Sequence, residues 1–89
     1  MNNTYKLEVT CKCPVDNLPD VYQLTVTAQR AIPVEDILAA AKELSSQSLY
    51  QEDLCQSLHR RINARCVLVG YHSGVMVRSE CGGAQGGQQ

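Results

Sequence analysis

Hydrophobic and polar residues alternate along two stretches near the N-terminus of the chain. Apolar side chains occupy odd positions over residues 5–12 and even positions over residues 21–29. A period of two predicts strands with one buried face, and a loop of this length between two such strands favours antiparallel pairing. The positions expected to face the core are Tyr5, Leu7, Val9, Cys11, Tyr22, Leu24, Val26 and Ala28.

The spacing of apolar residues lengthens to that of a helix after Pro33. Proline is favoured at the first helical position, so we expect a helix to open there, with an apolar stripe along Val34–Leu44. A second stripe at helical spacing consists of Leu54, Leu58 and Ile62. Upstream of that stripe, Ser48 and Gln51 have the spacing of a capping box, which predicts Ser48 as the N-cap of the second helix.

Two short strand-like runs follow, over residues 66–70 and 75–79, with a predicted hairpin turn over residues 71–74. The order strand, strand, helix, helix, strand, strand predicts an α+β fold, a four-stranded antiparallel sheet with both helices on one face. Such a sheet has two free edges, so assembly with other copies of the chain is expected. We assign residues 1–81 to a single domain and residues 82–89, which are Gly- and Gln-rich, to a disordered tail.

Composition narrows the class of protein. The 89 residues suffice for one small domain, and the balance of 44% hydrophobic and 19% charged residues is ordinary for a soluble one. The N-terminus is polar and unlike a signal peptide, and no apolar run approaches the ~20 residues of a membrane span, so we expect a cytoplasmic protein. Five cysteines, an odd number, favour reduced thiols over a disulfide framework. The net charge of −1 excludes a broad basic surface for nucleic acid.

The first candidate for chemistry is the stretch from Cys13 to Asp20, which contains Pro14 and Pro19 and connects the first two predicted strands. A cysteine reacts as its thiolate, so a neighbouring acid or base is one means of activating it. Two prolines stiffen the connector and can hold Cys13 and Asp20 in a fixed relation. The alternative is a buried cysteine beside a turn aspartate.

A second candidate is Glu52, at the start of the second predicted helix. Its carboxylate either stabilises the helix N-terminus, as Asp53 beside it can, or accepts N–H groups from a flat, purine-like heterocycle. Arg60, Arg61 and Arg65 near the end of the same helix either contact phosphates or form a solvated helix end.

Metal binding is disfavoured by the spacing of the thiols. Cys11 and Cys13 form one close pair, but the other three cysteines are single and no paired histidines follow, whereas zinc usually takes two clustered pairs of ligands. His59 and His72 are interpreted as surface or capping residues. The chain contains no glycine-rich phosphate loop.

Taken together, the element order and the residues just described resemble a known family. The order of elements is that of the T-fold (tunnelling fold), and Cys13-Pro14-Val15 with Asp20 seven positions later resembles the nitrile reductases of queuosine biosynthesis. The resemblance implies that Cys13 is the nucleophile, that Asp20 is the proton donor, and that Glu52 and its neighbour Gln51 bind 7-cyano-7-deazaguanine. At the position of Gln51 the family carries histidine.

Other departures point to one branch of that family. The reductases carry a Lys-rich segment linked to NADPH binding, which residues 32–38 here do not provide, and an Arg-Gly-Gly stretch that is absent from residues 71–75. In both respects, and in its Tyr-x-x-Gly-Val pattern followed by Gly-Gly, the chain resembles the shorter, amidine-forming archaeosine synthases. That likeness implies an enzyme without NADPH that joins ammonia to the nitrile carbon of the deazaguanine base, free or in tRNA or DNA, at sites between subunits of a homo-oligomer.

Two alternatives remain open from the sequence. One is an NADPH-dependent reductase acting on the same nitrile. The other is a non-catalytic T-fold module that binds a purine-like ligand or nucleic acid, which the loss of the histidine at Gln51 favours.

Overall fold

A computed structural model describes residues 1–83 of the chain, so positions 84–89 of the predicted tail lie outside the described residues. The chain folds into four strands and two helices in the predicted order. These are β1 (Asn3–Lys12), β2 (Pro19–Ala28), α1 (Val34–Ser45), α2 (Gln51–Ile62), β3 (Arg65–His72) and β4 (Val75–Cys81). All six predicted elements are present, and the differences lie at their ends.

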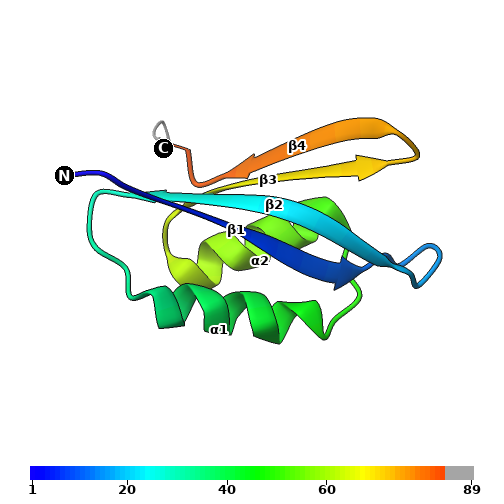
Figure 1. Cartoon of the computed structure of the whole chain (residues 1–89), viewed down its shortest axis with the longest axis horizontal. Coiled ribbons are helices and arrows are strands. Elements are labelled where there is room, and N and C mark those ends of the chain that lie inside the picture. The colour runs from blue at the N-terminus through cyan, green and yellow to red at the C-terminus, as the bar shows by residue number, and fades with distance from the viewer. Residues whose placement is uncertain (84–89) are drawn as a thin grey trace.

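The strands form one antiparallel sheet in the order β1-β2-β3-β4, and both helices cover the same face of it (Figure 1). This confirms the predicted α+β arrangement. The helix-facing side chains of β1 and β2 are those that the period of two selected, and Leu24 of β2 pairs directly with Leu68 of β3. Both leucines are fully buried against Leu54 and Leu58 of α2, which places the core between sheet and helices.

The start of α2 differs from the capping-box prediction. The helix begins at Gln51, with Tyr50 at the N-cap position and no side-chain cap. Ser48 instead forms an isolated parallel bridge with Lys12 at the end of β1. The side chain of Gln51 turns into the protein, so it is not available to close a capping box. The start of α1 also shifts by one position, because Pro33 is its N-cap and not its first helical residue.

Three connections lie at one end of the molecule, opposite both ends of the described chain: the β1–β2 loop, the α1–α2 connection and the β3–β4 hairpin (Figure 1). A backbone hydrogen bond of 3.1 Å from the Leu49 N–H to the Lys12 carbonyl joins the first two. Each helix has 12 residues, and within residues 1–83 neither is long and apolar enough to cross a membrane.

Candidate active site

A cavity of about 230 Å³ opens at the end of the molecule where the three connections meet. Its walls come from the β1–β2 loop, the start of β2, the α1–α2 connection, the first turn of α2 and the ends of β3 and β4. All four residues expected to form a site, Cys13, Asp20, Gln51 and Glu52, line this cavity. The structure therefore brings together residues that lie up to 39 positions apart in the sequence.

The backbone around Cys13 is closed by hydrogen bonds within the β1–β2 loop. The Cys13 N–H donates to the Leu18 carbonyl at 2.9 Å, and the Cys13 carbonyl accepts the Asn17 N–H at 2.8 Å. Asn17 adopts the left-handed conformation (φ 60°), which asparagine tolerates better than most residues. Asp16 accepts the Leu18 N–H at 3.0 Å through its side chain. The half-buried Cys13 is thus held at the edge of the cavity by a compact turn.

The cysteine two residues earlier has a different environment. The side chain of Cys11 is 1% exposed, and its thiol lies 3.3 Å from the Gln47 carbonyl and 3.6 Å from the Leu44 carbonyl. Burial raises the pKa of the Cys11 thiol above its ordinary value, which keeps it protonated. Cys11 therefore has a packing role and serves as an internal comparison for Cys13.

The remaining thiols are those of Cys55, Cys66 and Cys81. Burial raises the pKa of Cys55 and of Cys66 to about 12, and both side chains are fully buried. Cys81 is half-buried. Among residues 1–83, no three His, Cys, Asp or Glu side chains gather closely enough to hold a metal ion.

Asp20 lies in the cavity next to the ring of Tyr22. The Tyr22 hydroxyl donates to Asp20 Oδ2 at 3.4 Å, and burial raises the pKa of Tyr22, so the hydroxyl keeps its proton. The ring lies against Gly70 of β3, where an added Cβ would stand 2.5 Å from a ring carbon. Glycine at this position therefore makes room for the aromatic ring that supports Asp20.

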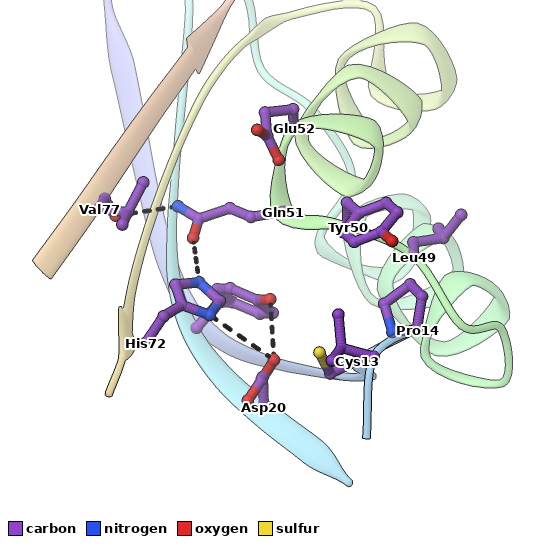
Figure 2. A pocket seen from close by; sticks show the side chains of 11 residues that line it. Cys13, Pro14, Asp20, Leu49, Tyr50, Gln51, Glu52, His72 and Val77 are labelled. Carbon is purple, nitrogen blue, oxygen red and sulfur yellow. Dashed lines mark hydrogen bonds and ion pairs between the residues drawn. The ribbon is translucent and has the colours of Figure 1, made fainter. Parts of the chain in front are cut away.

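Gln51 is 4% exposed, and protein groups occupy all of its polar atoms. Its Nε2 donates to the carbonyls of Leu68 at 3.0 Å and Val77 at 2.9 Å, one on β3 and one on β4. Its Oε1 lies 2.7 Å from Nε2 of His72 (Figure 2). Gln51 thus connects α2 to the last two strands from the wall of the cavity.

His72 is a site residue that the sequence interpretation missed. The predicted turn over residues 71–74 is shorter in the structure, where only Ser73 and Gly74 separate β3 from β4. Both have positive φ (52° and 83°), as two-residue hairpin turns of type I′ require. His72 is therefore the last residue of β3, on the helix-facing side with Leu68 and Gly70. Recognising Ser73-Gly74 as a two-residue turn is the signal that would have placed it there.

The imidazole of His72 points into the cavity between Gln51 and Asp20 (Figure 2). Its Nδ1 lies 4.0 Å from Asp20 Oδ2, and its ring centroid lies 6.0 Å from that of Tyr22, with the planes tilted by 49°. His72 therefore lines the cavity, where the sequence interpretation expected only a surface or capping residue. The expected capping role fits His59, whose Nδ1 lies 2.8 Å from the Ala64 carbonyl just beyond α2.

Glu52 is exposed on the first turn of α2, at the opposite end of the cavity from Asp20 (Figure 2). The arginines considered for phosphate contact are elsewhere, because they lie in or just after the last turn of α2, a 12-residue helix that is roughly 18 Å long. Arg61 pairs with Glu43, and Arg65 pairs with Glu80. These two cations are thus offset by neighbouring acids and lie away from the cavity.

No family model matches the chain, and no curated protein matches its sequence. Among solved structures, the crystal structure of the archaeosine synthase QueF-Like in the apo form is similar, with a TM-score of 0.78. The match covers 93% of this chain and 95% of that chain at 18% sequence identity. At that identity the likeness concerns the fold, and it confirms the ββααββ T-fold predicted from the order of elements.

Proposed function

We propose that this protein is an enzyme that converts the nitrile of a 7-cyano-7-deazaguanine base to an amidine with ammonia. The observation that carries the proposal is that Cys13, Asp20 and Glu52 line one cavity, on a fold similar to that of an archaeosine synthase. These are the three residues on which the sequence resembles that family. The half-buried position of Cys13 suits a nucleophile, whereas Cys11 is enclosed.

The reaction needs two additions at the nitrile carbon and no net oxidation or reduction. The Cys13 thiolate attacks the carbon and forms a C–S bond, while Asp20 in its acid form gives its proton to the nitrile nitrogen, producing a thioimide. Ammonia then attacks the same carbon, and the C–S bond breaks. Asp20 takes up a proton from the attacking nitrogen, and Cys13 leaves as the thiolate. Both groups return to their starting states, so the reaction needs no cofactor.

Glu52 is proposed to bind the base at the other end of the cavity. A carboxylate matches the ring N–H and exocyclic amino group of a deazaguanine, two donors that lie side by side. The base is accepted either free or within tRNA or DNA.

The open cavity also suggests that a second copy of the chain completes the site. Its volume of about 230 Å³ falls below the range of roughly 300–1,000 Å³ for typical ligand sites. Val15 and Tyr50 line it with 79% and 53% of their surface exposed, so apolar area is available for a neighbour to cover. Light scattering during size-exclusion chromatography would test this, and a monomer that turns over substrate would contradict it.

The experiment that tests the function is the intact mass of the protein after incubation with 7-cyano-7-deazaguanine, free and within an RNA oligonucleotide. We expect a gain equal to the whole substrate, because addition across a nitrile releases no atom. The adduct should form in wild type, in Cys11→Ala and in Cys81→Ser, and be absent from Cys13→Ala. Cys81→Ser is the matched control for a thiol that solvent reaches.

The reactant that releases the adduct, ammonia or NADPH, distinguishes the proposed function from its alternatives. Release of the adduct by ammonia as an amidine supports the proposal, whereas release by NADPH as an amine identifies a reductase. Binding that survives Cys13→Ala without any adduct in wild type leaves a non-catalytic binding module. That alternative has one observation in its favour, because the amide of Gln51 is occupied by protein groups where the family resemblance has a histidine.

A further inference from the structure

We propose that His72 and Asp20 share a single proton and that Gln51 fixes the direction of this pair. His72 is thereby a positioning residue for the proton that Asp20 transfers. Neither the motif of the β1–β2 loop nor the fold assigns a role to His72. The chain of contacts runs from α2 through the end of β3 to the start of β2, and all three side chains line the same cavity.

The direction of the chain follows from the carbonyls that hold Gln51. Backbone carbonyls only accept, so the two that contact Gln51 must face its NH2 group, and Oε1 is turned to His72. An amide oxygen also only accepts. The 2.7 Å contact therefore requires a proton on His72 Nε2. In the neutral imidazole the other nitrogen, Nδ1, then carries a lone pair, and this nitrogen faces Asp20.

A lone pair on Nδ1 and an ionised carboxylate are both acceptors, and two acceptors facing each other in a half-buried site repel. One added proton relieves this, either as an imidazolium beside a carboxylate or as a neutral imidazole beside a carboxylic acid. The Tyr22 hydroxyl donates to the same Oδ2. This contact holds the Asp20 side chain in place beside His72 in either protonation form. The present separation of 4.0 Å shortens to a hydrogen bond if the side chains approach by about 1 Å, as catalytic contacts commonly do on binding.

This arrangement suits both steps of the proposed function, on which this part of the inference rests. The shared proton passes through Asp20 to the nitrile nitrogen as the C–S bond forms. The pair is then left as a carboxylate facing a lone pair, which makes it a stronger base. It takes a proton from the attacking ammonia as the C–S bond breaks, and the starting state returns.

The test has one arm that needs no substrate. In protein with 15N-labelled histidine, we expect the chemical shift of His72 Nδ1 at neutral pH to depart from that of a free lone pair, and Asp20→Asn to restore the free value. A wild-type Nδ1 at the free-lone-pair value would overturn the pair, whatever the enzyme does.

The second arm measures the rate of adduct formation on Cys13 at saturating 7-cyano-7-deazaguanine. His72→Gln keeps a donor toward Gln51 but cannot carry the proton, so we expect a fall of about tenfold or more with the half-saturating concentration unchanged. In the Asp20→Asn background, His72→Gln should cost less than twofold, because His72 acts through Asp20. The matched control is His59→Gln at the far end of α2, expected within twofold of wild type.

The two arms separate failure of the pair from failure of the function. A shifted Nδ1 with no adduct in wild type supports the shared proton and contradicts the thioimide chemistry. An adduct that forms as fast in His72→Gln as in wild type overturns the positioning role. If His72→Gln does not fold, as judged by circular dichroism, His72→Asn replaces it with the same expected results.

Discussion

Gln51 makes the contacts that hold α2, β3 and β4 together at the cavity, so its replacement by leucine is the sharpest test of the site's construction. The side chain is 4% exposed and makes three hydrogen bonds, two to backbone carbonyls and one to His72. At about 1 kcal/mol for each hydrogen bond, the Gln51→Leu change removes about 3 kcal/mol. The more apolar leucine offsets about 1 kcal/mol of this by burial.

We therefore expect the free energy of unfolding to fall by about 2 kcal/mol, which for a domain of this size lowers the midpoint of thermal unfolding by roughly 8–16 °C. The assay is urea denaturation followed by far-UV circular dichroism. The slope of the unfolding free energy against urea concentration should be the same in the variant as in wild type. The control is Gln47→Leu, the same chemical change at an exposed residue, which should stay within about 0.5 kcal/mol of wild type. If the two variants lose equal stability, the buried hydrogen-bond network of Gln51 does not exist as described.

Two further predictions concern buried residues of the core. Gly70→Ala places a methyl group 2.5 Å from the Tyr22 ring, so we expect a loss of about 1–3 kcal/mol in urea denaturation. Tyr22→Leu in the same chain should relieve part of that loss, and strict additivity would contradict the close approach. Burial raises the pKa of Cys55 and Cys66 from 9.0 to about 12, so the unfolded chain loses these thiol protons at a lower pH than the folded protein does. Stability should be complete below pH 9.0 and fall as the pH rises toward about 12, and a level denaturation midpoint across that window would refute this.

The fold was predictable because the apolar spacing in this chain is unambiguous over most of its length. The period of two over residues 5–12 and 21–29 and the helical stripes ending at Leu44 and Ile62 each select one face, and a single layer arrangement buries all of them. The positions of Cys13 and Asp20 on one cavity followed from the short loop between two paired strands. These are local properties of the sequence.

What escaped prediction depends on contacts between distant parts of the chain. The pattern of Ser48 and Gln51 has a local explanation as a capping box, but carbonyls of β3 and β4 compete for the same amide, and no local pattern reveals them. His72 was missed because a four-residue turn was expected where the chain uses two residues with positive φ. Tyr71 and His72 were both assigned to the turn, so the side chain that faces Asp20 was not placed on a strand.

The bond between the Leu49 N–H and the Lys12 carbonyl has a consequence for the size of ligand that the cavity accepts. Cys13 directly follows Lys12, and Glu52 stands three positions after Leu49, so that single bond joins the two backbone segments that carry the thiol and the carboxylate. The spacing between these two backbone segments is therefore set by a main-chain contact. Substitutions of the side chains around the cavity change which ligand groups it binds. The spacing of the two segments, and with it the length of ligand that fits between them, stays the same.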